Sequence, residues 1–360
     1  MIELTLPALA EAEHPFIARL RTRRNAMTGP DDAILCDEDD TGATFAGAHG
    51  LLAIDGLSAQ ALDGDVVLVQ PDGGRIERLL RAGSPHNTLL VTERCDQLCV
   101  MCSQPPKKTH VDRFALFEQA CLLAEPDSVI GISGGEPTLY KAELLGMIER
   151  VLTARPDLAF HVLTNGQHFQ SEDIARLRAP LFRRILWGIP LYAHDAALHD
   201  HIVGKQGAFT RLEESLAHLL LSGARVELRT VLVRDNFEVL PELARYLATR
   251  LRFIHAWSIM QLEHVGFARN RWRELYVEHA QDFRPIAAAL DHAKLHGVPA
   301  HLFNFPRCTV PAPYRYLAAA SISDWKRKYV EACDGCRERE ACTGFFEWHP
   351  DAATEGVHPL

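Results

Sequence analysis

The stretch Thr92-Glu93-Arg94-Cys95-Asp96-Gln97-Leu98-Cys99-Val100-Met101-Cys102 carries three cysteines with the spacing C-x3-C-x2-C. It directly follows the apolar run 89–91, which is typical of a short strand, so we expect the cysteines on the loop that leaves the strand's carboxyl end. Three thiolates so close together can ligate three irons of one 4Fe–4S cluster and leave the fourth iron open to a small ligand. The alternatives are an incomplete structural zinc site or a chance cluster, although zinc sites mostly pair cysteines as C-x2-C.

A second motif closes the next apolar run, where residues 128–132 lead into Ser133-Gly134-Gly135-Glu136-Pro137-Thr138. Gly134 and Gly135 allow a backbone edge to come close to a ligand, and Glu136 places a carboxylate beside it. Alone, this motif also fits an ordinary β-to-α turn followed by a helix with a capping acid. At the end of the strand that follows a three-cysteine loop, it favours a binding site.

Together the two motifs resemble the radical S-adenosylmethionine (radical SAM) superfamily. The resemblance implies that a 4Fe–4S cluster on Cys95, Cys99 and Cys102 chelates the amino and carboxylate groups of S-adenosylmethionine through its open iron. It also implies that the Gly-Gly-Glu strand end holds the cofactor's amino group. The implied chemistry is homolytic cleavage of the cofactor to methionine and a 5′-deoxyadenosyl radical, which takes a hydrogen from the substrate. No side chain is assigned as a general acid or base, so the catalytic residues are unknown at this point.

Composition narrows the class of protein. The chain has 360 residues, 47% of them hydrophobic, which is enough for one large domain and a small one. A net charge of −9 argues against a general nucleic-acid or anionic-membrane binder. No apolar run approaches the roughly 18 residues of a spanning helix, and the N-terminus lacks the pattern of a signal peptide. Nine cysteines without export signals then indicate metal ligation in a reducing cytoplasm, with no membrane partner.

Residues 1–86 differ from the rest of the chain. The short apolar runs 33–35, 51–54 and 66–69 alternate with Asp- and Gly-rich turns, and the turn at 71–74 favours a hairpin. We therefore predict a small, mainly β N-terminal domain over 1–86. It holds no recognisable catalytic set, and Cys36 stands alone in it.

Residues 87–280 alternate between strand and helix patterns. Six β-α units with nearly continuous apolar strands indicate an α/β fold with a parallel sheet covered by helices. Eight units would close a TIM barrel, so six predict an open, partial (β/α)6 barrel, which is also the radical SAM core that the resemblance implies. Strands are expected at 88–92, 128–133, 160–164, 184–191, 226–233 and 256–262, and helices at 111–124, 139–154, 171–177, 209–222 and 238–251.

The carboxyl ends of parallel strands share one rim, and further polar residues are expected there. Asn165, after the third strand, is either a ligand of the cofactor ribose or substrate or a turn residue before Gly166. Glu227 and Arg229 alternate on one face of the fifth strand, and charged groups inside a barrel must be paired or ligand-bound. Either they form a structural pair, or Arg229 contacts the cofactor carboxylate.

The C-terminal region 281–360 holds a second group of cysteines. Cys333, Cys336 and Cys342 have the spacing C-x2-C-x5-C, and Cys308 stands twenty-five positions before Cys333. These four thiolates suffice for a second, fully ligated 4Fe–4S cluster, with a four-cysteine zinc site as the alternative. The spacing resembles the SPASM/twitch-like auxiliary-cluster segment of radical SAM peptide-modifying enzymes, C-x2-C-x5-C-x3-C. Phe346 stands at its last position, so we expect one auxiliary cluster.

The chain from about residue 86 to 348 also resembles the C-type radical SAM maturase of His-Xaa-Ser peptide systems. This resemblance implies a ribosomally made precursor peptide as substrate, and a cross-linked or oxidised side chain as product. It implies further partners, namely an electron donor of the flavodoxin or ferredoxin type and a companion maturase. The motifs that carry it are His86-Asn87-Thr88, Cys102-Ser103-Gln104-Pro105-Pro106, Gly188-Ile189-Pro190-Leu191-Tyr192, His199-Asp200-His201-Ile202-Val203-Gly204, Ser321-Ile322-Ser323-Asp324-Trp325-Lys326 and Cys333-Asp334-Gly335-Cys336.

Two positions depart from the wider superfamily. The residue before the third cysteine is usually aromatic and lies beside the adenine, whereas here it is Met101, which offers only backbone and apolar contact. Many peptide-modifying relatives carry His-Asp-x-x-Arg, and here Val203 replaces the arginine. Lys205 or Arg229 would then supply the positive charge.

Three other functions compete with peptide maturation. The first is a radical SAM enzyme that acts on a small metabolite or on RNA, of which the acidic composition disfavours RNA. The second is a maturase that oxidises a protein residue to a catalytic aldehyde. The third is a non-catalytic scaffold that carries metal clusters for a partner.

Overall fold

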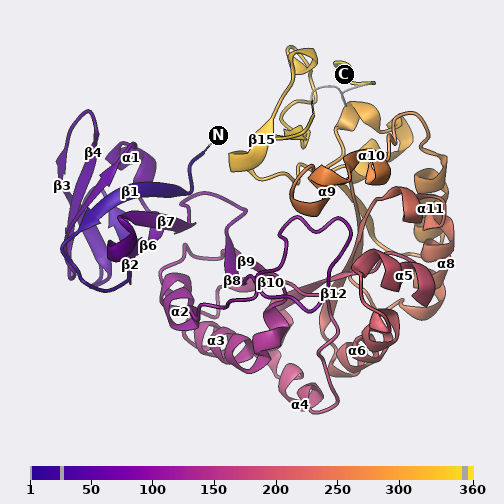
Figure 1. Cartoon of the computed structure of the whole chain (residues 1–360), viewed down its shortest axis with the longest axis horizontal. Coiled ribbons are helices and arrows are strands. Elements are labelled where there is room, and N and C mark those ends of the chain that lie inside the picture. Colours follow the sequence, from indigo (N-terminus) through magenta and orange to yellow (C-terminus); the bar gives the residue numbers. More distant parts are fainter. Residues whose placement is uncertain (1, 25–27, 351–355) are drawn as a thin grey trace.

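The structure is a computed structural model that describes residues 2–24, 28–350 and 356–360. Figure 1 shows three parts in chain order: a small β-barrel, a parallel sheet with helices outside it, and a C-terminal segment beside one end of the sheet. None of the helices in the described ranges is long and apolar enough to cross a membrane.

Seven short strands at the start of the chain close into a barrel. All neighbouring strands run antiparallel except β2 and β3, and β1 completes the barrel by pairing with both β5 and β7. Inward side chains such as Leu20, Phe45 and Ile76 are fully buried and form one apolar core. The strands are β1 (Thr5–Ala10), β2 (Phe16–Arg21), β3 (Asp32–Glu38), β4 (Gly42–Gly47), β5 (Gly50–Asp55), β6 (Val66–Gln70) and β7 (Arg75–Leu80), with helix α1 (Ala59–Leu62) between β5 and β6.

The middle of the chain forms a seven-stranded sheet in which every neighbouring pair is parallel and the sheet order follows the chain order. The α/β class and the parallel sheet predicted from the sequence are therefore confirmed. The strands are β8 (Thr88–Thr92), β9 (Val129–Gly134), β10 (Ala159–Leu163), β11 (Ile185–Pro190), β12 (Arg225–Val231), β13 (Ala256–Met260) and β14 (Ala300–Phe303).

The predicted number of six strands is wrong by one, because β14 lies in the region that we had assigned wholly to the C-terminal segment. Its four residues include the exposed His301 and only one fully buried side chain, Leu302. Pro299 and Pro306 stand close on either side. So short and mixed a run has no periodicity that distinguishes a strand from a loop.

Helices cover the outer face of the sheet and form an arc around it in Figure 1. Outward side chains such as Phe160, Trp187 and Trp257 are fully buried under them in the main core. The helices are α2 (Phe114–Leu122), α3 (Lys141–Ala154), α4 (Asp173–Leu177), α5 (Ala196–Val203), α6 (Ala208–Ser222), α7 (Arg234–Phe237), α8 (Leu240–Arg250), α9 (Gly266–Asn270), α10 (Trp272–Leu275) and α11 (Arg284–Leu295).

The opposite face of the sheet is only partly covered. His161, Leu163, Arg229 and Met260 point to this inner face and are half-buried, whereas their neighbours along each strand are buried. The alternation distinguishes an inner surface that is open to ligands from an outer surface that is closed by helices.

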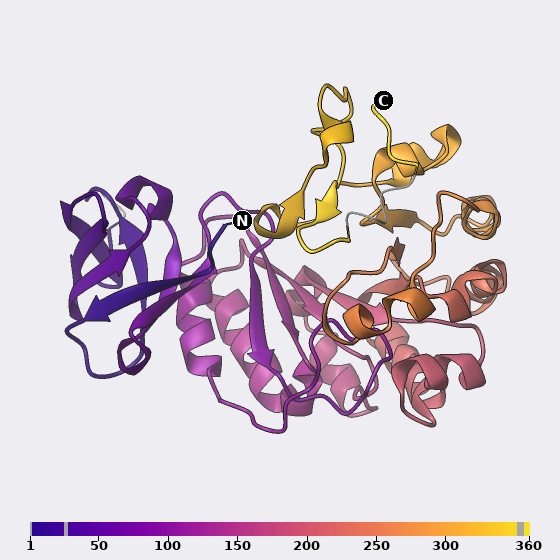
Figure 2. The ribbon, with the colours of Figure 1, turned by 45° about the horizontal axis from the view of Figure 1, so that its top comes forward.

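The C-terminal segment returns to the start of the sheet (Figure 2). It contains the two-stranded pair β15 (Arg327–Lys328) and β16 (Phe345–Phe346). Asp324 pairs with Arg81, at 2.5 Å, in the linker between the β-barrel and β8. Arg113, just before α2, pairs with Glu77 of the barrel at 3.1 Å. The C-terminal segment is thus tied to the linker before β8, and the β-barrel is tied to the start of α2.

Candidate functional site

The three-cysteine loop follows β8 at the carboxyl end of the sheet. Cys95, Cys99 and Cys102 are half-buried and form no disulfide. Burial is the main cause that raises the pKa of Cys95 to about 11 and that of Cys99 to about 12, and the two neighbouring cysteines contribute to the shift of Cys99. A positive metal centre on this loop would favour the thiolates.

Two helices hold the cysteine loop in place. The backbone amide of Leu98 donates to the carbonyl of Val203, at the end of α5, over 3.1 Å. On the other side, the amide of Phe267 in α9 donates to the carbonyl of Cys102 over 2.9 Å. The position of the sulfur atoms is therefore set by backbone bonds from distant parts of the chain.

The Gly-Gly-Glu motif lies directly against this loop. The amides of Gly135 and Glu136 donate to the carbonyls of Thr92 (2.8 Å) and Arg94 (2.7 Å). A Cβ on Gly134 would lie 2.5 Å from the Thr92 carbonyl oxygen, and one on Gly135 would overlap that of Arg94. The two glycines are required here because the backbone leading into the cysteine loop occupies the space of a side chain.

The Glu136 carboxylate is fully buried and accepts hydrogen bonds from protein groups. Its oxygens accept from the amide of Thr138 (2.8 Å), the hydroxyl of Thr164 (2.6 Å) and the amide of Asn165 (2.5 Å). Burial raises the pKa of Glu136, and these hydrogen bonds oppose that effect. Glu136 thus joins the ends of β9 and β10, and its direct contact with a cofactor stays a prediction.

Asp96, between the first two cysteines, is a site residue that sequence reasoning missed. Its carboxylate accepts from the side-chain amide of Asn165 at 2.7 Å, contacts the imidazole of His168 at 3.2 Å and pairs with Lys205. Burial alone would raise the pKa of Asp96, but His168 and Lys205 lower it well below its usual range. Asn165 therefore holds the cysteine loop, and a role toward a ribose stays a prediction.

A second polar group lies on the inner face of the sheet around Glu227. This carboxylate is 3% exposed and contacts His161 of β10 at 2.7 Å, Arg229 of β12 at 3.0 Å and the hydroxyl of Ser258 of β13. Burial would raise the pKa of Glu227, but His161 and Arg229 lower it to about 2. The structural pair of Glu227 and Arg229 is thus present. A contact of Arg229 with a cofactor carboxylate stays a prediction.

Gly188 makes this polar group possible. His161 and Glu227 lie on β10 and β12, which are separated by β11. Gly188 of β11 pairs with Glu227 on one side and with Leu163, two residues beyond His161, on the other. A Cβ at Gly188 would lie 2.9 Å from His161 Nε2 and 3.1 Å from Arg229 Cδ. The two side chains meet across a strand because that strand carries no side chain between them. The alternation of side chains along each strand could have placed His161 and Ser258 on the inner face. It could not have shown that both contact Glu227.

Tyr192 packs beside the cysteine loop. It is 7% exposed and shares an apolar cluster with Met101, Ile202 and Val203. Burial raises the pKa of Tyr192 well above its ordinary value, Cys99 raises it further and Arg229 lowers it. Tyr192 therefore packs against the cysteine loop through this cluster. The Met101 side chain packs beneath the loop, and its contact with an adenine stays a prediction.

The second group of cysteines gathers in the C-terminal segment. Burial raises the pKa of Cys308 and of Cys333, and Cys342 adds to both shifts. The sulfur of Cys342 accepts from the backbone amides of Arg307 (3.3 Å) and Gly344 (3.4 Å). Amide donors directed at sulfur suit thiolates that carry the negative charge of a cluster.

Neither group is arranged as the ligands of a single ion. Within the described ranges, no three or more His, Cys, Asp or Glu side chains converge as they would around one metal ion. Zinc holds its four sulfurs about 2.3 Å from a common point. A 4Fe–4S cube instead binds its thiolates at separate corners.

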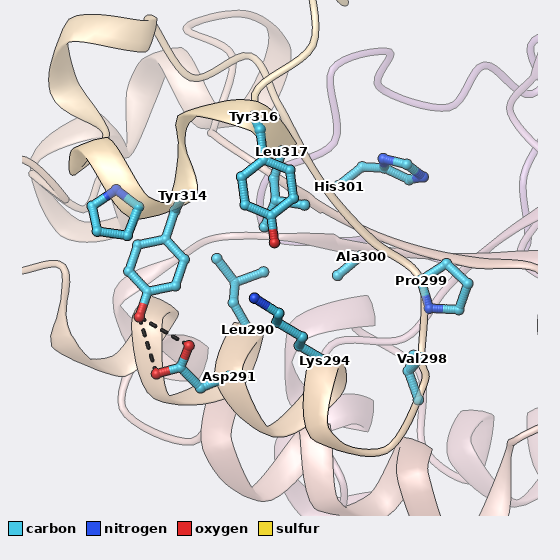
Figure 3. Close-up of a pocket in the computed structure, with 11 residues that line it drawn as sticks. Leu290, Asp291, Lys294, Val298, Pro299, Ala300, His301, Tyr314, Tyr316 and Leu317 are labelled. Atoms are coloured by element: carbon cyan, nitrogen blue, oxygen red, sulfur yellow. Dashed lines mark hydrogen bonds between the residues drawn. The ribbon is translucent and has the colours of Figure 1, made fainter.

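A separate pocket of about 320 Å³ lies between α11, β14 and the 3₁₀ helix Ala312–Leu317 (Figure 3). The Tyr314 hydroxyl donates to both oxygens of Asp291 over 3.0 Å, and Tyr316, Lys294 and His301 form the other walls. No site residue predicted from the sequence lines this pocket.

No family model matches the chain. Over 201 residues it is 26% identical to an AdoMet-dependent heme synthase from Nitratidesulfovibrio vulgaris, covering 53% of this chain and 52% of the synthase. The chain thus spans about half the length of the curated relative that it matches. Among solved structures it is similar to Streptococcus suis SuiB bound to S-adenosylmethionine (TM-score 0.48, 16% identity, 60% of this chain and 49% of SuiB). It is also similar to a radical SAM methyltransferase from Sphaerobacter thermophilus (TM-score 0.45, 16% identity, 74% and 75%).

Proposed function

We propose that this chain is a radical SAM enzyme whose first 4Fe–4S cluster is held by Cys95, Cys99 and Cys102. The observation that carries the proposal is the gathering of three half-buried thiols on one loop at the carboxyl end of a parallel sheet. Three thiolates leave one iron of a cluster open. The similarity to an AdoMet-dependent enzyme supports S-adenosylmethionine as the molecule that this iron binds.

When bound, the cluster and S-adenosylmethionine supply one-electron cleavage of the sulfonium and removal of a hydrogen atom from the substrate. The chain's own residues position these groups. Glu136 and Asp96 fix the strand ends and the cysteine loop relative to one another through hydrogen bonds. The residues proposed to contact the cofactor are Met101, Gly134, Gly135, Glu136, Asn165 and Arg229.

We further propose that Cys308, Cys333, Cys336 and Cys342 hold one auxiliary 4Fe–4S cluster, which supplies an electron-transfer site when bound. The amides directed at Cys342 support this assignment. In this scheme residues 1–86 form an appended domain, 87–280 carry the radical SAM site and 281–360 carry the auxiliary cluster. The division follows function, because β14 of the sheet lies within the last of these ranges.

The proposed substrate is a side chain of a ribosomally made precursor peptide, cross-linked or oxidised by the enzyme. The half-buried inner face supports a substrate in the barrel interior, where His161 and Arg229 lie beside Glu227. A flavodoxin- or ferredoxin-type donor would supply electrons, and a companion maturase is a further proposed partner.

A second candidate is a radical SAM enzyme that acts on a small metabolite. The similarity to a heme synthase over 201 residues favours it. Co-expression with each short peptide encoded in the neighbourhood of this chain's gene distinguishes the two candidates. A mass change in any of these peptides supports peptide maturation, and an unchanged mass in all of them together with active cofactor cleavage supports the small molecule.

The experiment that tests the proposed chemistry is cofactor cleavage by the anaerobically reconstituted, reduced protein. The wild type should release 5′-deoxyadenosine from S-adenosylmethionine, and the triple variant Cys95→Ala, Cys99→Ala, Cys102→Ala should release none. Cys36→Ala is the matched control, because Cys36 is exposed on the β-barrel and should leave cleavage unchanged. Persistent cleavage in the triple variant would contradict the proposal.

A further inference from the structure

The last described residues of the chain, 356–360, lie on the second group of cysteines. The amide of Leu360 donates to the sulfur of Cys336 over 3.4 Å, and the amide of Arg337 donates back to the carbonyl of Leu360 over 3.0 Å. One of the four cysteines, Cys336, thus receives a backbone hydrogen bond from this terminal segment.

The segment is anchored away from the sulfur atoms as well. His358 Nδ1 lies 2.9 Å from the carbonyl oxygen of Gly356, which fixes the turn between them. Val357 lines a small pocket together with Tyr276 and His279, beneath the end of β13. These contacts hold the segment in place beside Cys336.

The hydrogen bond to the Cys336 sulfur bears on the reduction potential of a cluster held there. Hydrogen bonds to the sulfurs of an iron–sulfur cluster stabilise its more negative, reduced state, and exclusion of water shifts its potential as well. The amides at Cys342 come from Arg307 and Gly344, close to the cysteines in the chain. The amide at Cys336 comes from the terminal segment, which can be altered without changing any ligand.

We propose that residues 356–360 form a strap over the second cluster that raises its reduction potential through the backbone amide of Leu360. The inference rests on the proposed function, because it requires a cluster on the four cysteines. Its consequence is that the strap sets how readily the auxiliary cluster accepts an electron.

The test compares two variants at one position. Leu360→Pro removes the amide that donates to Cys336 and adds no charge, whereas Leu360→Ala keeps the amide and shortens the side chain. Both variants should retain about eight irons in two clusters. The midpoint potential of the second cluster is then measured by a redox titration followed by electron paramagnetic resonance, without substrate.

Leu360→Pro should shift the reduction equilibrium about tenfold toward the oxidised cluster, which is about 59 mV for one electron. Leu360→Ala should match the wild type, and deletion of 356–360 should shift the equilibrium at least as far as Leu360→Pro. Equal potentials in all of these proteins, each with both clusters present, would overturn the strap alone. A wild type that holds a single cluster would contradict the proposed function and the strap together.

Discussion

Replacing Gly188 by alanine should separate His161 from Glu227 without changing any charged group. The new Cβ would lie 2.6 Å from Leu163 Cδ2, 2.9 Å from His161 Nε2 and 3.1 Å from Arg229 Cδ. The end of the leucine side chain can turn away, but the imidazole lies against the strand and must move as a ring. That movement lengthens its 2.7 Å contact with the Glu227 carboxylate.

The cost of Gly188→Ala has two sources. Overpacking by one methyl group against the imidazole and the Arg229 side chain costs about 1–3 kcal/mol. A weakened hydrogen bond to a buried carboxylate costs about 1.5–3 kcal/mol. One displacement causes both, so the two costs overlap, and we expect a total of about 2–3 kcal/mol.

Denaturant unfolding followed by the fluorescence of the buried Trp187 and Trp257 measures this cost as a shift of the unfolding midpoint. The matched control is Gly29→Ala, because a Cβ there meets no atom closer than 3.9 Å and should change the midpoint little. In a His161→Ala background most of the penalty of Gly188→Ala should disappear. A wild-type midpoint in Gly188→Ala, or an unchanged penalty in that background, would refute the reasoning.

Three further changes test the polar and cysteine groups. The folded pKa of Glu227 is about 2, below its ordinary value near 4.5, so its stabilising contribution is present above pH 4.5 and is lost as the pH falls toward 2. Glu227→Gln should therefore weaken the dependence of the unfolding midpoint on pH in this range, and an unaltered dependence would count against the contact. Glu136→Ala should destabilise the fold by about 2–4 kcal/mol, because the buried donors around this carboxylate lose their acceptor. It should also weaken S-adenosylmethionine binding, measured by calorimetry, while both clusters remain. Unchanged binding would mean that the Gly-Gly-Glu motif is an ordinary turn. Replacing Cys333 and Cys336 by alanine should reduce the iron content from about eight to about four atoms per chain and leave cofactor cleavage in place. In the wild type, a metal content of about four irons and one zinc would exclude the auxiliary cluster.

The sequence predicts those parts of the molecule that local chemistry determines. The strands before Cys95 and Gly134 are apolar runs that end in a loop, so their place at the rim of a parallel sheet follows from their pattern. Seven cysteines in two local groups are visible as spacing alone. β14 was missed because its four residues are too few and too mixed to show a period.

The rest depends on register and on the approach of distant segments. The contact of Asp96 with Asn165 joins residues far apart in the chain, and nothing near Asp96 distinguishes it from a solvated loop acid. The contact of His161 with Glu227 requires both a parallel register and a glycine on the strand between them. The alternation of side chains predicts the face of the sheet on which a residue lies. It does not predict which residue two strands away that side chain contacts.

The most direct measurement of the central claim is electron paramagnetic resonance of the reduced first cluster, with and without S-adenosylmethionine. It uses the protein with Cys333 and Cys336 replaced by alanine, so that only the cluster on Cys95, Cys99 and Cys102 contributes. We predict the signal of one 4Fe–4S cluster, whose shape changes when S-adenosylmethionine binds the open iron. A cluster signal that S-adenosylmethionine leaves unchanged, or no cluster signal at all, would contradict the account.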